Sequence, residues 1–568
     1  MMRRIPILLG CLLLLTTISQ SQIKRETRAV WLSTNFKLDW PPPTFDEGEQ
    51  KSALIEIFDN LQKKNINTVY FQVRSNATLF YTSAIEPFTP YLTGKTNVPP
   101  SYDPLKFAIA EAHKRGLEIH AWFNVVRCFS GSDAEISNYE NHIINKHKDW
   151  VYKKWTDGKP AFWLDPGKPE VREYLKNLIV EVVQKYEVDG IHLDFIRYPV
   201  GGIEDDETFR TYGNNPDKAD WRRENINSIV RSVYRESKKA NPKVKIGATP
   251  VGIYKNTKIV KGLQGYHDVY QDAQGWLKEG IVDYIVPQIY WDFENNPKFD
   301  VVAKDWLDNS SGRNVILGIA SYRGDIKKET EKMISLSRKE GAAGIAFFRY
   351  TNIKNEKFYS FEEIAFPSGM EWVDNIYPNP PINLKSSTID EGKYQLNWSL
   401  PEIKNGGSDI NHFSIYSLPE NNSLFINAEL FYLSHSLNTS LTFSITQPQR
   451  INYYFSIKSV DKLWNESSSS SNIVQLTIPE LKMVSENVRS SNKPVLVGMS
   501  KQQWYLTLNS HIEQSVIITL RLSDGKEEEK TFPLAMGDNI IELNIKSSEP
   551  KFIELIFSGE NRREKLVL

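Results

Sequence analysis

The sequence predicts an α/β protein in which an eight-unit (β/α) barrel is followed by two all-β, sandwich-like domains. Three observations favour this fold class. At 568 residues the chain is too long for a single core. Between residues 28 and 350, short β-branched or aromatic runs alternate with longer segments of helical period. After Phe366 the helical periodicity stops, which indicates a change to β structure.

Eight strands are expected in the first part of the chain. Helical segments lie between them, such as 102–116 and 169–186, in which apolar residues recur every three or four positions and a Pro marks the first turn. Eight such units predict a TIM barrel. The expected strands are 28–34, 66–73, 117–124, 188–196, 244–250, 282–291, 314–321 and 343–350.

The N-terminus has the features of a secretory signal peptide. Two arginines precede the apolar run Ile5–Leu15, and the small residues Ser19 and Ser21 offer a cleavage site, so residues 1–22 are expected to be removed on export. No later run approaches the roughly 20 apolar residues of a membrane-spanning helix. The protein is expected in the periplasm, on the outer-membrane surface or secreted. A lipoprotein remains an alternative, because "LLGC" at 8–11 resembles a lipobox.

Charge and cysteine content limit the kind of partner. The chain has 69 basic and 70 acidic side chains, which excludes the electrostatic footprint of a nucleic-acid or anionic-membrane protein. Aromatic residues make up 12% of the chain, which suits a surface that stacks on sugar rings. Loss of the leader leaves Cys128 alone, so no intrachain disulfide is expected and Cys128 is interpreted as a buried hydrophobic residue. The sequence does not predict whether the protein is a monomer or an oligomer.

The expected domain boundaries lie where the helical periodicity of the sequence gives way to short strand-like runs. The barrel is expected over 24–370, and "PNPP" at 378–381 is a linker. Residues 380–478 read as short strands that resemble a fibronectin type III sandwich. Residues 479–568 again read as strands and predict a second small β-domain.

The stretch "DGIHLDFIRYP" at 189–199 indicates how the fourth barrel strand is oriented. A barrel strand points alternate side chains toward the helices and toward the interior. Ile191, Leu193 and Phe195 are therefore expected to face the helices, and His192 and Asp194 to face inward. Asp194 lies at the C-terminal end of the strand, where barrel enzymes build their active sites.

The same alternation recurs in three other strands. Each strand places apolar residues on the side of the helices and polar or aromatic residues inside the barrel. Together the four strands bring more polar side chains to the barrel mouth than a packed core needs. The inward residues are expected to be Tyr70, Gln72 and Arg74 in the second strand, His120, Trp122 and Asn124 in the third, and Gln288, Tyr290 and Asp292 in the sixth.

This arrangement suits hydrolysis of a glycosidic bond, which uses one carboxylate as nucleophile or base and a second carboxylic acid to protonate the leaving oxygen. Asp194 is the expected nucleophile or base, although pairing with Arg197 would make it structural. Asp292 and Asp272 are the candidates for the acid. Asp272 could instead cap the helix that begins near Ala273. Two further carboxylates, Asp165 and Asp39, also follow strands or precede helices.

A sugar would need hydrogen-bonding and stacking partners at the same mouth. No metal or other cofactor is expected, because His113, His120 and His192 lack metal-ligand spacing and no phosphate loop or nucleophile elbow occurs. His120 and His192 could meet inside the barrel. The expected substrate-binding residues are Arg74, Asn124, His192, Arg197, Gln288, Tyr290, Trp291 and Arg349.

Six motifs resemble the bacterial glycosyl-hydrolase-like family 10 over residues 26 to about 360. The resemblance implies a TIM barrel, export and polysaccharide hydrolysis, with some members acting on peptidoglycan glycan strands stripped of peptides. It maps Asp194 onto the family's acidic residue at the fourth strand and Gln288, Tyr290 and Trp291 onto its "PQIYW" wall, and it favours Asp272 over Asp292. The motifs are "RAVWLSTNFKLDWPP", "INTVYFQVRSNATLFY", "YDPLKFAIAEAHKRGLEIHAWFN", "FWLDPGKPEVREYL", "VDGIHLDFIRYP" and "VDYIVPQIYW".

The fourth-strand motif also resembles that of chitinases, in which a Glu follows the last Asp by two positions. Ile196 stands at that place, so a chitinase-type acid is missing. The sequence therefore predicts an exported glycoside hydrolase that acts on a polysaccharide, with peptidoglycan glycan strands as the expected substrate. The alternatives are a non-catalytic glycan-binding barrel and an α-glucan hydrolase.

Overall fold

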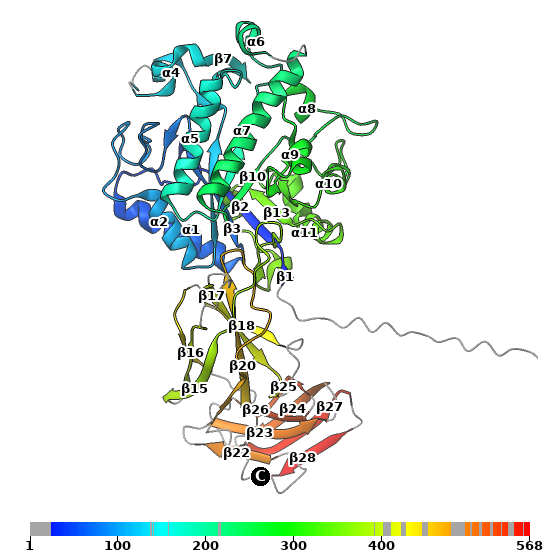
Figure 1. The fold of residues 1–568 in the computed structure, drawn as a ribbon. Coiled ribbons are helices and arrows are strands. Elements are labelled where there is room, and N and C mark those ends of the chain that lie inside the picture. The colour runs from blue at the N-terminus through cyan, green and yellow to red at the C-terminus, as the bar shows by residue number, and fades with distance from the viewer. Residues whose placement is uncertain are drawn as a thin grey trace, which may run out of the picture.

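The structure is a computed structural model of the chain (Figure 1). It describes residues 24–567 apart from a set of short gaps, so the expected signal peptide and the lipobox lie outside the described residues. The gaps are 137–138, 140, 157, 214–216, 391, 402–409, 422–427, 435, 446–451, 479–494, 500–502, 511–513, 523–525, 536, 544–549 and 560–561.

Eight parallel strands close into a barrel, which confirms the predicted TIM barrel. Around the barrel the order is β2-β13-β12-β11-β10-β9-β5-β3, and β3 pairs with β2 to close the sheet. Each strand falls within or beside the range expected from the sequence. The strands are β2 Thr27–Leu32, β3 Thr68–Ser75, β5 Glu118–Asn124, β9 Gly190–Asp194, β10 Lys245–Ala248, β11 Tyr284–Ile285, β12 Asn314–Ile319 and β13 Gly344–Phe348.

A helix follows each barrel strand and packs on the outside. Two of these helices, α2 and α5, begin with the prolines that the sequence marked as first turns. The helices are α1 Glu47–Lys63, α2 Pro104–His113, α5 Pro169–Lys185, α7 Lys218–Ala240, α9 Ala273–Glu279, α10 Phe299–Asp308, α11 Gly324–Lys339 and the short α12 Tyr350–Ile353. Shorter elements lie in the loops: β4 Thr78–Leu79, α3 Asp133–Ile136, α4 Ile143–Lys146, α6 Asp206–Tyr212, α8 Gly265–Asp268, and the hairpin strands β6 Arg127–Ser130, β7 Val151–Thr156 and β8 Lys159–Leu164.

The sixth strand is much shorter than expected. The sequence predicted a strand over 282–291, but β11 ends at Ile285. Pro287 has no N–H to donate to a neighbouring strand, and beyond it only single bridges join Gln288 to Val251 and Gly318. The alternation of side chains therefore does not continue to Asp292.

The barrel interior is filled by large rings that lie opposite glycines. Trp31, Tyr70, Trp122 and Tyr284 pack inside the barrel, separate from the core that joins strands to helices. Gly247 pairs with Tyr284 across β10 and β11, and a Cβ at Gly247 would overlap the Tyr284 ring. This glycine thus provides the space for the ring on the next strand.

Below the mouth, a chain of buried hydrogen bonds runs through the barrel interior. The Trp31 indole can only donate, and it donates to His192 Nε2 at 2.9 Å, so His192 carries its proton on Nδ1 and donates to the Tyr284 hydroxyl at 3.1 Å. The Tyr284 hydroxyl then donates to His120 Nδ1 at 2.7 Å, and His120 Nε2 donates to Glu118 at 3.2 Å. His120 and His192 therefore meet through Tyr284.

Two all-β regions follow the barrel, as predicted. In the described part of the first, strands β15 Ile382–Asp390, β16 Lys393–Ser399 and β19 Ser440–Ser444 form one sheet, and β18 Glu429–Leu433, β17 Ile410–Leu418, β20 Asn452–Asp461 and β21 Val474–Thr477 form the other. In the second, β22 Val495–Met499, β23 Gln503–Ser510 and β26 Gly537–Leu543 form one sheet, and β25 Glu527–Leu534, β24 Gln514–Leu522, β27 Pro550–Phe557 and β28 Arg563–Val567 form the other. Each region has its own apolar core.

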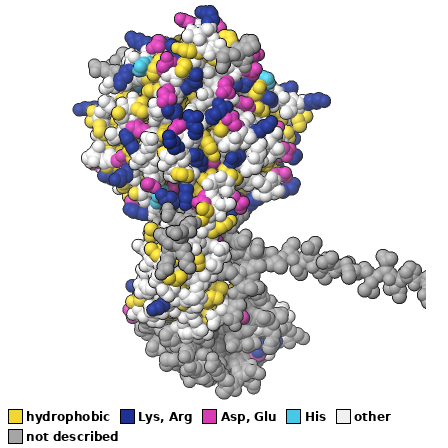
Figure 2. Space-filling model, in the orientation of Figure 1, with side chains coloured by type: hydrophobic (Ala, Val, Ile, Leu, Met, Phe, Trp, Pro, Cys, Tyr) yellow, Lys and Arg dark blue, Asp and Glu magenta, His cyan; other side chains and the backbone are white. Residues whose placement is uncertain are grey.

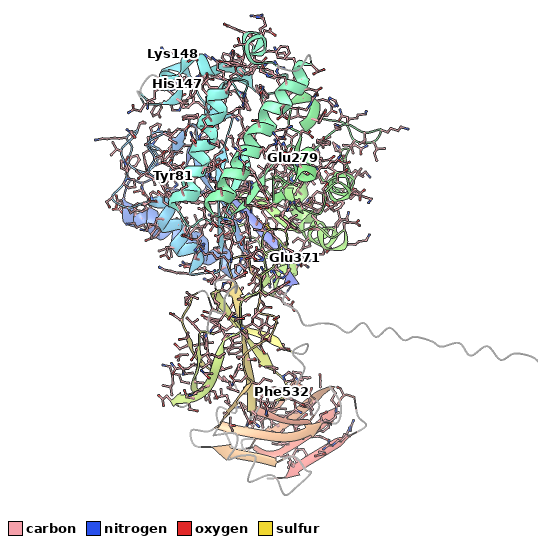
Figure 3. The ribbon with its side chains drawn as sticks, in the orientation of Figure 1. Tyr81, His147, Lys148, Glu279, Glu371 and Phe532 are labelled. Carbon is pink, nitrogen blue, oxygen red and sulfur yellow. The ribbon has the colours of Figure 1, made fainter. Side chains whose placement is uncertain are left out.

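The first β-region packs against the N-terminal end of the barrel strands. Short strands β1 Lys24–Arg25 and β14 Ala365–Phe366 pair at this end, where Phe366 contacts Trp464. Figure 3 labels Glu371 at the junction and Phe532 in the second β-region, far from the barrel. Because active sites of such barrels lie at the opposite end, the β-regions leave the barrel mouth open.

The surface carries mixed charge. Figure 2 shows basic and acidic side chains interspersed over the visible face of the barrel. In the described part of the chain, no helix is both long and apolar enough to cross a bilayer. Cys128 is fully buried and burial raises the pKa of its thiol to about 12, which confirms its interpretation as a core residue.

Candidate active site

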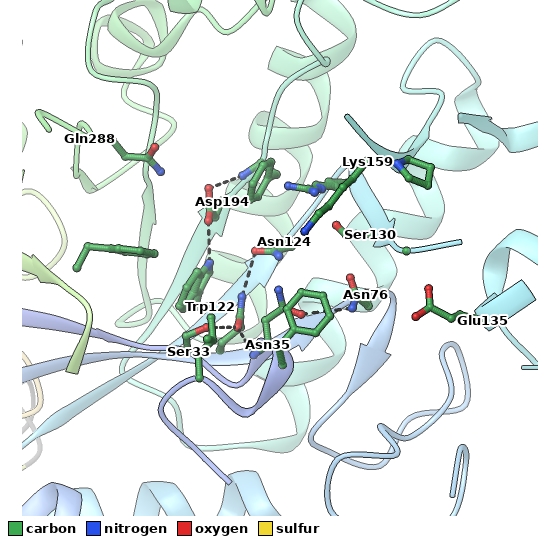
Figure 4. Close-up of a pocket in the computed structure, with 18 of the residues that line it drawn as sticks. Ser33, Asn35, Asn76, Trp122, Asn124, Ser130, Glu135, Lys159, Asp194 and Gln288 are labelled. Carbon is green, nitrogen blue, oxygen red and sulfur yellow. Dashed lines mark hydrogen bonds between the residues drawn. The ribbon is translucent and has the colours of Figure 1, made fainter. Parts of the chain in front are cut away.

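A cavity of about 930 Å³ opens at the C-terminal ends of the barrel strands (Figure 4). Its volume lies within the range of small-molecule sites and would accommodate several sugar rings. Amides, hydroxyls and aromatic rings predominate in the lining, which is formed by Ser33, Asn35, Phe36, Leu38, Gln72, Asn76, Trp122, Asn124, Arg127, Ser130, Gly131, Ser132, Glu135, Lys159, Pro160, Asp194, Phe195, Gln288, Tyr290 and Phe348.

Asp194 lies in the wall of this cavity as the last residue of β9. Its Oδ2 accepts a hydrogen bond from Trp122 Nε1 at 3.2 Å, and its Oδ1 accepts one from the backbone N–H of Phe195 at 2.7 Å. Phe195 has a φ of +49°. This left-handed residue ends the strand alternation, so Phe195 lines the cavity instead of facing the helices as expected.

Burial controls the acidity of Asp194. The side chain is 7% exposed, and loss of solvation raises the pKa of its carboxyl to about 6, although the Phe195 amide and the Arg197 guanidinium lower it. Arg197 forms no ion pair with it in the described structure and instead stacks over Trp163 and Phe195. Asp194 is therefore a carboxyl group that exchanges a proton near neutral pH, which is the property of a general acid or base.

Three predicted substrate-binding residues line the cavity with Asp194. Asn124 pairs with Asp194 across β5 and β9, and its Oδ1 accepts a hydrogen bond from Gln72 at 3.3 Å. Figure 4 shows Gln288 on one side of Asp194, its amide directed into the cavity. The Tyr290 hydroxyl is buried without a hydrogen-bond partner among the described residues, and burial together with the charge of Asp194 raises its pKa.

Residues of the 127–160 segment form the other side of the cavity, and sequence reasoning missed them. This segment contributes Arg127 from β6, Glu135 from α3 and Lys159 from β8, where β6, β8 and β7 form a small antiparallel sheet. In Figure 4, Lys159 and Glu135 lie across the cavity from Gln288, and Glu135 is at the far end from Asp194. Ser132 N donates to Glu135 at 2.6 Å. The aromatic and basic residues of "RCFS" and "KPAFWL" carry no barrel-strand signal, so only the cavity reveals their role.

Asp292 does not line the cavity. Its carboxylate accepts hydrogen bonds from the backbone N–H of Glu294 and Asn295 at 2.9 and 2.7 Å, and from Asn295 Nδ2 at 2.8 Å. The bonds from Asn295 lower the pKa of Asp292. A carboxylate held ionised in its own loop is a poor proton donor.

The other expected carboxylates also have structural partners. Asp272 caps α9 by accepting from Gly275 N at 3.1 Å, which confirms the capping alternative, and it accepts from Tyr254. Asp165 accepts from Gly167 N and Thr208 and caps no helix. Asp39 pairs with Arg349 behind the cavity wall. None of the three is among the described residues that line the cavity.

Five further residues expected to bind substrate are not among the described residues that line the cavity, and one of them is Arg197, which lies over the Trp163 and Phe195 rings. Arg74 is fully buried, forms a two-point ion pair with Glu86 and donates to the carbonyls of Asn124 and Val125. His192 lies in the buried chain beneath the cavity, where burial lowers its pKa and keeps it neutral. Trp291 packs toward Gly252, and Arg349 is bonded to Asp39 and the Leu38 carbonyl.

Within the described residues, no group of three or more His, Cys, Asp and Glu side chains is placed to hold a metal ion. The described lining of the cavity supplies one buried carboxyl of raised pKa, the Glu135 carboxylate, a phenol, several amides and two cations.

The fold, the cavity and comparison with known proteins place the chain in the class of TIM-barrel glycoside hydrolases. It belongs to the family described as glycosyl hydrolase-like 10, whose profile matches residues 26–334, more than half of the chain. This confirms the family resemblance of the six motifs.

Two named relatives support the same family. The chain is 36% identical to the glycosyl hydrolase DigH of Escherichia coli K12 over 331 residues, which cover 53% of this chain and 74% of that protein. It is 32% identical to the glycosyl hydrolase YngK of Bacillus subtilis 168 over 492 residues, which cover 80% of this chain and 94% of that protein. Among solved structures, the PgaB (BpsB) glycoside hydrolase domain from Bordetella bronchiseptica aligns with 60% of this chain and 99% of that domain, with a TM-score of 0.43 and 11% identity.

Proposed function

We propose that the protein hydrolyses glycosidic bonds in peptidoglycan glycan strands from which the peptides have been removed. The observation that carries this proposal is Asp194, a buried carboxyl with a pKa of about 6 in the wall of a cavity of about 930 Å³ lined by amides, hydroxyls and aromatic rings. The resemblance of the motifs to a family with members that act on such strands supports the choice of glycan.

Asp194 acts in this proposal as the general acid. Sequence reasoning expected a nucleophile or base, but a carboxyl whose pKa is raised by burial keeps its proton at mildly acidic pH and can deliver it to the leaving oxygen. Tyr290 also lines the cavity, and its buried hydroxyl has no hydrogen-bond partner among the described residues, so it would be available to a sugar group that reaches it. Gln288 and Asn124 would hold the sugar hydroxyl and acetamido groups.

Fewer carboxylates are proposed to act in catalysis than the sequence suggested. Asp292 and Asp272 are bound in their loop and helix cap, so neither is proposed as the acid. Glu135 is the other carboxylate among the described cavity-lining residues, and its place at the far end of the cavity argues against direct partnership with Asp194.

The cations of the cavity fit a glycan that carries carboxylates. Removal of the peptide from a muramic acid residue leaves a free lactyl carboxylate. Arg127 and Lys159 line the cavity, and Lys159 lies opposite Gln288, so such a group would find positive charge there. A neutral α-glucan would make no use of this charge.

Location and accessory domains form part of the same proposal. We propose export by the signal peptide at 1–22, because the substrate lies outside the cytoplasm. The proposed domains are the barrel at 24–370, a fibronectin type III-like sandwich at 380–478 and a second β-domain at 479–568. The two β-regions lie away from the barrel mouth, which suits attachment to glycan or to the cell surface.

The proposal is tested by release of reducing ends. Mature protein is incubated with peptide-free glycan strands beside the Asp194→Asn variant, with Asp292→Asn as a matched carboxylate control. We expect new reducing ends from the wild type and from Asp292→Asn, and a loss of at least about 100-fold from Asp194→Asn, the scale of a lost general acid. Equal products from all three would refute the role of Asp194. Binding without products would favour the glycan-binding alternative, and products from soluble starch oligomers alone would favour an α-glucan hydrolase.

A further inference from the structure

An exposed aromatic residue lines the cavity in a strained backbone conformation. Phe36 follows β2, is 57% exposed and contributes to the cavity wall beside Leu38, which is 45% exposed. Its φ is +51° and that of Lys37 is +56°. Two consecutive non-glycine residues in the left-handed region are unusual, and a bulky aromatic residue there is an outlier.

The surrounding structure holds this loop in place. Gln72 Oε1 accepts hydrogen bonds from the backbone N–H of Thr34 and Asn35 at 3.0 and 2.9 Å. On the other side of Phe36, Asp39 Oδ2 accepts from Ser33 N at 2.8 Å, and Asp39 Oδ1 accepts from Arg349 Nη1 at 2.6 Å. The Asp39 side chain is fully buried. The loop is therefore anchored on both sides of the exposed ring.

Core packing does not account for this arrangement. The Phe36 ring remains largely in water, so its burial does not stabilise the strained backbone. Strained residues persist where their surroundings fix them, and they gather at ligand sites. Phe195, which also has a positive φ, lines the same cavity next to Asp194. A fixed apolar ring in a cavity that is also lined by amides and hydroxyls matches a ligand with one apolar face and several polar groups.

We propose that Phe36 is a stacking platform for the C–H face of a pyranose ring in the bound glycan, and that the Asp39–Arg349 pair positions it. This inference rests on the proposed function, because it assigns a binding subsite within the same cavity. The aromatic face provides area without polar groups of its own, so it selects for sugar rings whose C–H bonds share one face. Asp39 and Arg349, which the sequence singled out as candidate site residues, act through the loop.

Phe45 is a matched control for this proposal. It is also 57% exposed, it lies nine residues further along the same connection, and it is not among the described residues that line the cavity. Its ring lies 4.5 Å from Lys37 Nζ. Removing Phe45 removes an equal exposed ring without touching the cavity.

The experiment measures binding separately from hydrolysis. Phe36→Ala, Phe36→Trp and Phe45→Ala are made in the full chain, and their dissociation constants for peptide-free glycan strands are measured in an Asp194→Asn background. KM and kcat are measured in the wild-type background. We expect Phe36→Ala to raise the dissociation constant and KM about 10-fold, the scale of one aromatic contact, whereas Phe36→Trp and Phe45→Ala stay within about twofold.

Positioning by Arg349 is tested with a double variant. Arg349→Lys is expected to raise KM in the wild-type background but to add nothing to Phe36→Ala, because its effect passes through the ring. Equal effects of Phe36→Ala and Phe45→Ala would overturn the platform, and additive effects would overturn the positioning role. If the wild type binds strands through Phe36 but releases no reducing ends, the proposed hydrolysis fails while the platform stands.

Discussion

Trp464 of the first β-region donates its indole N–H to Glu118 Oε1 at 2.8 Å inside the N-terminal end of the barrel. Glu118 also pairs with Lys245 and accepts from His120, so its carboxylate has three donors. Burial alone would raise the pKa of Glu118, but Lys245 and His120 outweigh it and lower the pKa. The β-region is thus joined to the barrel at the end of the barrel axis that lies opposite Asp194.

Removing the charge of Glu118 should destabilise the barrel strongly. Glu118→Gln leaves the Lys245 ammonium, 2% exposed, without its carboxylate, and we expect a loss of about 3–5 kcal/mol in the free energy of unfolding. Trp464→Phe removes one donor and should cost about 1 kcal/mol. Urea unfolding followed by circular dichroism measures both. A loss below about 1 kcal/mol for Glu118→Gln would contradict this account.

The pH dependence of this contribution has a definite sign. The folded-state pKa of Glu118 lies below its unfolded value, so the stabilisation is present at neutral pH and is lost as the pH falls below about 4.

Gly247→Ala should disrupt the barrel interior, because the new Cβ would overlap the Tyr284 ring on the neighbouring strand. Overpacking of this kind costs about 1–3 kcal/mol or more. Gly324, at the start of α11, serves as the control, because a Cβ added there would meet open space. Thermal unfolding should show a lower Tm for Gly247→Ala alone; equal Tm values for both variants would show that the interior can adjust.

The sequence predicted the barrel well because strand and helix periods are local signals. All eight strands were found, and residues such as Ile191, Leu193 and Val69 face the helices as the alternation required. Asp194 and Asn124 line the cavity for the same reason, whereas Gln288 and Tyr290 line it from the segment that follows the end of β11 at Ile285. The alternation of residues, however, predicts only on which side of the strand a side chain lies, and not how far it is from the barrel mouth. His192 lies on the same side of β9 as Asp194, but it is buried among the rings of the barrel interior below the mouth.

The remainder of the site depends on contacts that no local pattern encodes. Asp292 misses the cavity because β11 ends early and the chain turns to bond Asn295. Arg74 does not line the cavity because it forms a buried ion pair with Glu86, twelve residues further along the chain. Lys159 lines the cavity from the start of β8, in a small sheet outside the barrel, and Phe36 lines it from a loop that is anchored by Gln72 and Arg349.

Asp194 should destabilise the folded barrel at neutral pH. Its folded-state pKa of about 6 exceeds the unfolded value, so the folded state binds more protons between about pH 4 and 6 and stability falls as the pH rises through that window. A shift of about two pKa units corresponds to about 2–3 kcal/mol. The free energy of unfolding of Asp194→Asn minus that of the wild type should be about 2–3 kcal/mol higher at pH 7.5 than at pH 4, because only the wild type loses stability over this range. An unchanged difference would mean that Asp194 titrates normally.

Lys159 should contribute to recognition of carboxylates. Lys159→Gln is expected to raise KM for peptide-free glycan strands about threefold, the scale of one partly exposed ion pair, whereas Lys159→Arg keeps the charge and the KM. The same strands with their carboxylates converted to amides give the control measurement, on which wild type and Lys159→Gln should converge. A threefold difference that persists on the amidated strands would assign Lys159 a role unrelated to charge.

The pH dependence of kcat/KM on peptide-free glycan strands tests the central claim most directly, because it reports the protonation state in which Asp194 works. With Asp194 as the general acid and a pKa of about 6, kcat/KM should fall about 10-fold for each pH unit above about 6. A rate that rises through pH 6, or one that stays level from pH 5 to 8, would contradict the assignment of Asp194 as proton donor.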